Sequence, residues 1–154
     1  MREVPKKNYF IMLIIILSVI AITIVLSNIY NNKLKRTSIM YNYLSEIKIK
    51  DIDTYLIEKP YTILYISDKY DLSHNEEEKT IKNSITNYNL KDYFVFLNLN
   101  QENIDYIDKL NKKYNGQIRK ETPVIVIIED GKIVQTIYQL KSINLKELTR
   151  DIKW

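Results

Sequence analysis

Residues 122–138 read TPVIVIIEDGKIVQTIY, and this stretch decides the fold. Two runs rich in β-branched residues, 123–129 and 132–138, lie on either side of the pair Asp130-Gly131. β-branched residues favour strands, and an Asp-Gly pair favours the tight turn of an antiparallel hairpin. The stretch therefore predicts two neighbouring strands of one sheet, joined by a two-residue turn.

Three further strands are expected before this hairpin. Residues 61–67 (YTILYIS) and 93–98 (YFVFLN) are nearly continuous apolar runs, which is typical of central strands buried on both faces. Residues 43–48 (YLSEIK) alternate between apolar and polar side chains in the manner of a short strand. Together with the hairpin, these runs predict a mixed sheet.

Helical periodicity fills the segments between the strands. Apolar residues at helical spacing predict helices over 51–58, 74–89, 101–114 and 143–154. We expect Asn100 and Ser142 to cap the last two, and the run Glu76 to Glu78 to lie in solvent at the start of the second. The order β-α-β-α-β-α-β-β-α predicts a three-layer α/β/α sandwich.

The strongest single signal lies near the N-terminus. Residues 10–29 read FIMLIIILSVIAITIVLSNI, and the chain has no charged residue between Lys7 and Lys33. At about 1.5 Å per residue, such a helix spans roughly the 30 Å hydrocarbon core of a bilayer. We therefore expect four parts: an N-terminal tail (1–9), a transmembrane helix (10–29) that binds the lipid bilayer, a juxtamembrane linker (30–42) and an α/β domain (43–154).

Two other interpretations of the apolar stretch are weighed against an anchor. A buried core helix would have to be apolar on every face inside a small domain. A cleaved signal peptide would have a shorter apolar run and an A-x-A site, and the sequence has neither. A short basic tail before a first apolar segment usually stays inside, so we expect a single-pass protein of the cell membrane with an extracellular domain (N-in, C-out).

The composition excludes several kinds of chemistry. The chain has no Cys, so disulfides, thiolate nucleophiles and dithiol redox reactions are excluded, and its one His leaves no histidine-based metal cluster. Residues 51–110 hold six basic and twelve acidic side chains, so the net charge of +4 does not gather in one basic stripe. We therefore expect no nucleic-acid partner, no cofactor and no bound metal.

The domain resembles the thioredoxin family in three stretches. Residues 122–134 (TPVIVIIEDGKIV) resemble the segment in which a proline, cis in that family, opens a strand that turns through an Asn-Gly or Asp-Gly hairpin. Residues 61–74 (YTILYISDKYDLSH) resemble the central strand running into the active-site loop, and 94–100 (FVFLNLN) the next strand. The resemblance covers 43–154 and implies a thioredoxin-like fold.

The resemblance also implies where a binding groove would lie. It aligns residues 70–73 (YDLS) with the Cys-x-x-Cys motif of the family, so both sulfur positions are occupied by other residues. In that family the residue before the cis-proline offers backbone groups to an extended peptide. The implied groove is lined by Tyr70, Asp71, Leu72, Ser73, Thr122 and Pro123. The alternative is that the proline has a purely structural role.

Other chemistries at this loop have weak support. Ser73-His74 is a serine beside a histidine, but adjacent loop residues rarely align a hydroxyl with an imidazole, and no Gly-rich oxyanion loop accompanies them. The acidic residues nearby lack the spacing of a calcium loop. We therefore expect no catalytic residue and no metal ligand here.

These observations favour a redox-inactive, membrane-tethered domain that binds a protein or peptide partner at the envelope as an accessory factor, and that is not an enzyme. It resembles, distantly, the anchored thioredoxin-like accessory proteins of Gram-positive bacteria, some of which accompany bacteriocin systems. Two alternatives stay open. One is a component of a thiol-disulfide exchange system whose sulfurs come from a partner chain, and the other is a structural membrane protein whose groove has no function.

Overall fold

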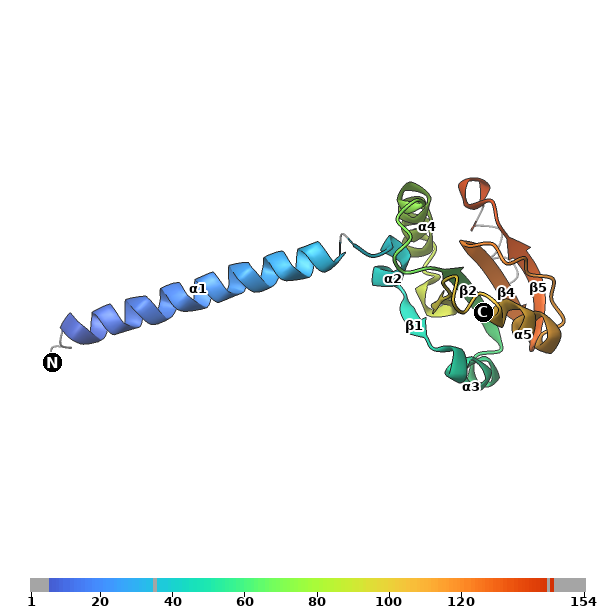
Figure 1. Cartoon of the computed structure of the whole chain (residues 1–154), viewed down its shortest axis with the longest axis horizontal. Helices are drawn as coiled ribbons and strands as arrows, with labels where there is room; N and C mark the ends of the chain where they lie inside the picture. The colour runs from blue at the N-terminus through green and yellow to red at the C-terminus, as the bar shows by residue number, and fades with distance from the viewer. Residues whose placement is uncertain (1–5, 35, 144, 146–154) are drawn as a thin grey trace. The chain divides into compact units, whose positions relative to one another are not determined.

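The computed structural model describes residues 6–34, 36–143 and 145, and divides the chain into two compact units, Met1–Arg36 and Thr37–Trp154 (Figure 1). Residues 37–43 differ from the linker we expected over 30–42. Thr37 and Ser38 are buried, and α2 (Ile39–Tyr43) follows them. The Ser38 side chain caps α2 by accepting a hydrogen bond from the backbone N–H of Tyr41 at 3.0 Å. This stretch therefore belongs to the second unit.

The first unit contains α1 (Lys6–Leu34). Its part from Asn8 to Asn32 is long and apolar enough to cross a membrane, and its side chains are exposed. The hydroxyls of Ser18 and Thr23 each donate a hydrogen bond of 2.8 Å to the carbonyl oxygen four residues earlier. Their polar hydrogens are thus satisfied within the helix, as a lipid environment requires.

The second unit is built on a five-stranded mixed sheet in the order β1-β3-β2-β4-β5. The strands are β1 (Ser45–Ile47), β2 (Tyr61–Ser67), β3 (Phe94–Asn98), β4 (Val124–Glu129) and β5 (Lys132–Ile137). β1, β3 and β2 are parallel, and β4 is antiparallel to both β2 and β5. The central strand β2 has the bounds that its apolar run predicts.

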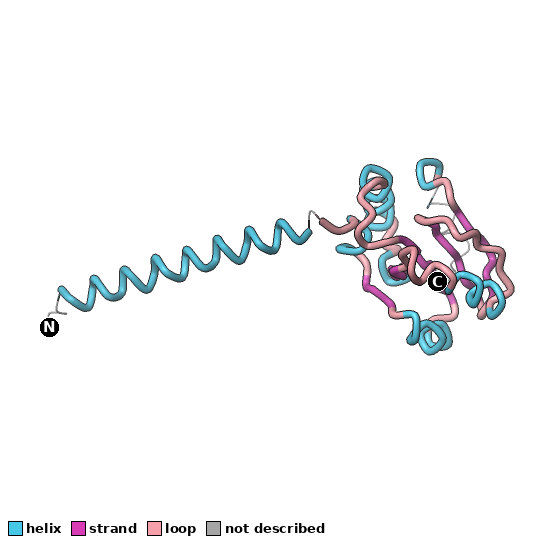
Figure 2. The backbone as a smooth tube through the Cα atoms, in the orientation of Figure 1, coloured by secondary structure: helices cyan, strands magenta, loops and turns pink. Residues whose placement is uncertain are grey.

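Helices cover both faces of this sheet (Figure 2). They are α2, α3 (Ile52–Glu58), α4 (Asn75–Asn87) and α5 (Tyr106–Lys113). Alternate residues of β2 point to opposite faces: Ile63 and Tyr65 pack with residues of α2 and α4, while Leu64 and Ile66 pack with residues of α3 and α5. The predicted α/β/α sandwich is confirmed.

The hairpin turn is confirmed as well. Asp130 and Gly131 have φ angles of 48° and 72°, both in the left-handed region that a tight hairpin turn uses. Gly131 carries no Cβ and adopts this region without steric cost.

Two helix expectations need correction. The helix expected over 101–114 begins only at Tyr106. The Asn100 side chain accepts hydrogen bonds from the N–H groups of Glu102 and Asn103 at 3.1 and 3.3 Å, and so closes a turn instead of capping a helix. Most of the helix expected after Ser142 falls on residues 144 and 146–154, outside the described residues.

Candidate functional site

The loop after β2 is organised by its own aspartates. The N–H of Tyr70 donates to Asp68 Oδ1 at 2.9 Å, and the N–H and hydroxyl of Ser73 donate to Asp71 Oδ1 at 2.9 and 2.6 Å. These are the local turns that Asp side chains favour. The side chains of Tyr70 and Leu72 stay 64% and 40% exposed. The loop thus presents two large side chains to its surroundings on a fixed backbone.

The electrostatics of this loop favour a carboxylate. Partial burial raises the pKa of the Asp71 carboxyl, but the two hydrogen bonds from Ser73 and the neighbouring His74 outweigh it, so the pKa lies below its ordinary value. Because the Ser73 hydroxyl donates to Asp71, it is not aligned with an imidazole as a nucleophile would be.

A cleft of about 450 Å³ opens beside the start of α4. Its lining comes from α4, from the residue before β4 and from the segment after β5: His74, Glu77, Pro123, Tyr138, Gln139, Leu140 and Lys141. The peptide bond between Thr122 and Pro123 is cis, as the resemblance implies. Pro123 is buried and Thr122 half-buried.

Of the six residues expected to line a groove, Pro123 lies in the wall of this cleft. Tyr70, Asp71, Leu72, Ser73 and Thr122 are outside its lining, although His74, which follows Ser73 in the chain, lies in it. The residues from Tyr138 to Lys141 were not predicted. They follow a hairpin and carry no motif, so only the fold brings them to Pro123.

The lining of the cleft includes an ion pair. Lys141 Nζ lies 3.4 Å from Glu77 Oε1. The backbone N–H at Glu77 and the Lys141 ammonium hold the pKa of the Glu77 carboxyl below its ordinary value. The buried Pro123 and Leu140 supply the apolar part of the wall. The cleft thus combines apolar surface with an ion pair.

Glu78 corrects our expectation that the three glutamates lie in solvent. Its side chain is only 1% exposed. It shares the buried face of α4 with Ile81 and Ile85, which lie three and seven residues further on. The spacing of Glu78, Ile81 and Ile85 is that of one face of a helix. This spacing is the signal in the sequence from which the burial of Glu78 could have been predicted, in spite of its charge.

The Glu78 carboxylate accepts two buried hydrogen bonds. Tyr65 Oη donates to its Oε1 at 2.9 Å, and the N–H of Met40 donates to its Oε2 at 3.2 Å. Burial raises the pKa of the Glu78 carboxyl, and the hydrogen bonds from Met40 and Tyr65 oppose part of that rise. Glu78 therefore ties α4 to β2 and to α2 at once.

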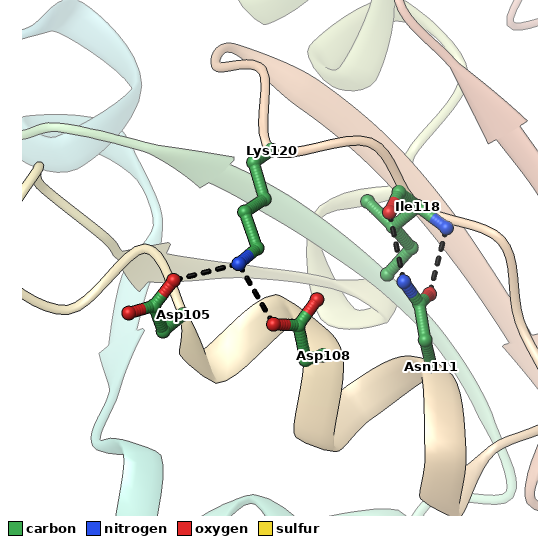
Figure 3. A network of polar contacts seen from close by, with 5 residues as sticks. All are labelled: Asp105, Asp108, Asn111, Ile118 and Lys120. Atoms are coloured by element: carbon green, nitrogen blue, oxygen red, sulfur yellow. Dashed lines mark hydrogen bonds and ion pairs between the residues drawn. The ribbon is translucent and has the colours of Figure 1, made fainter.

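A polar network holds the segment that leads to Thr122 (Figure 3). The Asn111 side chain donates to the carbonyl oxygen of Ile118 at 2.8 Å and accepts from its N–H at 2.7 Å. Lys120 Nζ bridges Asp105 and Asp108 at 2.6 and 2.7 Å. Figure 3 shows both contacts reaching from α5 and the turn before it. The approach to the cis peptide bond is thereby fixed to α5.

One further hydrogen bond connects this segment to the cleft. The N–H of Arg119 donates to Tyr138 Oη at 2.6 Å. Within the described residues, no three His, Asp or Glu side chains are grouped so that they could hold a metal ion.

Comparisons with known proteins identify the fold. Neither a protein-family model nor a curated protein sequence matches this chain. Among solved structures, mitochondrial thioredoxin 3 from Saccharomyces cerevisiae in its oxidised form has a TM-score of 0.51 at 13% identity, covering 73% of this chain and 96% of that one. A protein described as an oxidoreductase with a thioredoxin fold has a TM-score of 0.52 at 15% identity, covering 72% and 95%. The domain therefore has a thioredoxin-like fold.

Proposed function

We propose that this chain is a membrane-tethered thioredoxin-like domain that binds a peptide or protein segment and carries out no dithiol chemistry. The observation that carries the proposal is an open cleft beside the cis Thr122-Pro123 bond, in a thioredoxin-like fold that has no cysteine. A disulfide exchange needs a thiolate, and none of the 154 residues supplies one. What the fold retains is the surface beside its cis-proline.

The chemistry of the cleft supports binding of an extended peptide. A volume of about 450 Å³ lies within the range of known ligand pockets and is large enough for one or two side chains. Pro123 and Leu140 offer apolar contacts, while Glu77 and Lys141 offer one acceptor and one donor. Apolar pockets with a few placed polar groups are how peptide sites combine affinity with orientation.

The tether supports a role at the membrane. α1 has the length, apolar surface and internally bonded hydroxyls of a spanning helix. Three basic residues precede the span and three follow it closely, so the charge of the flanks does not set its direction. A short basic tail before a first apolar segment usually stays inside, and we propose that orientation, with the domain on the outer face. We propose an accessory role at the cell envelope, in which the domain holds a partner near the bilayer.

Site-specific photocrosslinking in intact membranes tests the binding proposal. A photoreactive phenylalanine analogue is introduced at Gln139 in the cleft wall, and in the matched control at Ile57, which is 82% exposed on α3. We expect a discrete adduct from position 139 that is absent from position 57 and is reduced when Leu140→Trp fills the cleft. Equal adducts at both positions, or an adduct unaffected by the filled cleft, would contradict the proposal.

Protease treatment of intact cells tests the tether and its orientation. A protease added outside should degrade the domain and leave a membrane-embedded fragment containing α1. Complete protection, with degradation only after the cells are opened, would place the domain on the inner face.

A further inference from the structure

We infer that the loop from Lys69 to Leu72 rests in the interfacial layer of the membrane that α1 enters, with the side chains of Tyr70 and Leu72 among the lipid headgroups. The inference rests on the tether proposed above and goes beyond the binding of a peptide. It names a second ligand of the domain, a phospholipid surface, and the residues that contact it.

The length of chain after α1 limits how far the domain can lie from the bilayer. The candidate span ends at Asn32, and the first buried residues of the domain are Thr37 and Ser38. Six residue steps, even fully extended, cover roughly 20 Å. The intervening residues include Lys33, Lys35 and Arg36, which are attracted to headgroup phosphates. The part of the domain around Ser38 is therefore held close to the headgroups.

The loop lies directly beside this point of attachment. The N–H of Ser38 donates to the carbonyl oxygen of Lys69 at 2.8 Å. The side chain of Ser38 is fully buried, and two residues later the N–H of Met40 is bound by Glu78. The start of the domain is therefore built into its core, and the loop contacts it at Ser38.

The side chains of the loop suit an interface between lipid and water. Tyr70 is 64% exposed and Leu72 is 40% exposed, although both are large and apolar in part. Lys69 Nζ lies 5.0 Å from the centre of the Tyr70 ring, which gives an aromatic body with a cation at its edge. Tyrosine and lysine of this kind are enriched at the headgroup level, where an apolar body and a polar tip are both accommodated.

Hydrogen bonds inside the loop lower the free-energy cost of placing its backbone in the headgroup layer. The N–H groups of Tyr70 and Ser73 are already bound by Asp68 and Asp71. The negative charges of the two aspartates outweigh the one positive charge of Lys69, so we expect the apolar surface of Tyr70 and Leu72, rather than charge, to supply the attraction.

Tryptophan fluorescence in reconstituted vesicles tests this inference. The full chain is prepared with Trp154→Phe, which removes its one native tryptophan, together with either Tyr70→Trp or, as the control, Ile57→Trp. Both replaced side chains are exposed, at 64% and 82%, so neither change disturbs the core. The vesicles are phosphatidylcholine, with and without bromine on the acyl chains close to the headgroup.

Brominated lipid should quench a tryptophan at position 70 about twofold or more relative to one at position 57, because an interfacial ring lies within reach of the bromine. The quenching should persist at high salt. Equal quenching at both positions in protein that floats with the vesicles would overturn the inference and leave the tether intact. Protein that fails to float would overturn the tether, and the inference with it.

Discussion

Against α3 and α5 the sheet presents mainly aliphatic side chains such as Leu64, Ile66 and Leu97, whereas against α2 and α4 it also presents the Tyr65 hydroxyl, bound to the buried Glu78 carboxylate. Among the residues whose burial the structure describes, Glu78 is the one buried Asp, Glu, Lys, Arg or His. The first face is thus held by apolar contact and by part-buried hydrogen bonds such as those between Asn111 and Ile118, and the second by apolar contact and the buried hydrogen bonds of Glu78.

The difference teaches where the two kinds of contact are useful. Apolar packing is not directional, so it covers the sheet without fixing the position of any one group. The buried hydrogen bonds of Glu78 fix position, and they hold α2, the first helix of the second unit, to α4 and to β2. Four substitutions test this division, in order of decreasing expected effect.

Leu97→Ala should have the largest effect. Leu97 is fully buried on the aliphatic face, and truncating such a residue removes apolar contacts and leaves a cavity. The free energy of unfolding of the full chain in lipid nanodiscs, measured with denaturant, should fall by about 2–5 kcal/mol. Val134→Ala, at a site 54% exposed on β5, is the control and should change it little. A small loss at Leu97 would mean that this face does not dominate stability.

Glu78→Ala should cost about 1–3 kcal/mol, because it leaves the Tyr65 hydroxyl and the Met40 N–H without their acceptor. The same denaturation experiment measures it. Glu76→Ala removes an exposed carboxylate two residues earlier, on the opposite side of α4, and should have little effect. If the two variants were equally stable, the hydrogen bonds of Glu78 would not hold α2.

The raised pKa of Glu78 makes stability depend on pH in a defined direction. The folded state holds the proton of the Glu78 carboxyl more tightly than the unfolded chain does. The contribution of this proton to the free energy of unfolding is therefore fully present below the ordinary pKa of 4.5, and it is lost as the pH rises through the pKa of the folded state. Wild type should therefore lose stability relative to Glu78→Gln as the pH is raised above 4.5. If the difference in free energy of unfolding between wild type and Glu78→Gln did not change above pH 4.5, the pKa of Glu78 would not be raised.

Lys120→Ala should have the smallest effect. Lys120 pairs with Asp105 and Asp108 at the surface, where water and side-chain entropy offset most of the attraction. We expect no change in the denaturation midpoint, in contrast to Asn111→Ala, which removes two hydrogen bonds to the backbone of Ile118. A larger loss from Lys120→Ala would mean that the ion pairs, and not Asn111, fix this segment to α5.

The sequence predicted the parts of this fold that rest on periodicity and turn chemistry. The strand over 61–67 is an unbroken apolar run, and the hairpin rests on Asp130-Gly131, so both could be recognised locally. α2 was missed because five residues carry no helical period, and it is held by contacts from residues distant in the chain.

The candidate cleft was less predictable from the sequence than the fold. Pro123 could be recognised, because a proline at the start of an apolar strand before an Asp-Gly turn is a local pattern. The cleft wall from Tyr138 to Lys141 depends on where the chain travels after β5, which no local pattern specifies. Glu78 was misplaced because its charge suggested solvent, whereas its buried partners come from elsewhere in the chain.

The paired bonds at Ser38 and Met40 also have a mechanical consequence. A pull arriving along the backbone from the N-terminal side meets the Ser38 bond to Lys69 and the Met40 bond to Glu78 before it reaches any strand. Through Tyr65, part of that tension passes into β2, at the centre of the sheet. A pull on the start of the domain is thus passed to the central strand of the sheet as well as to its edge strand β1.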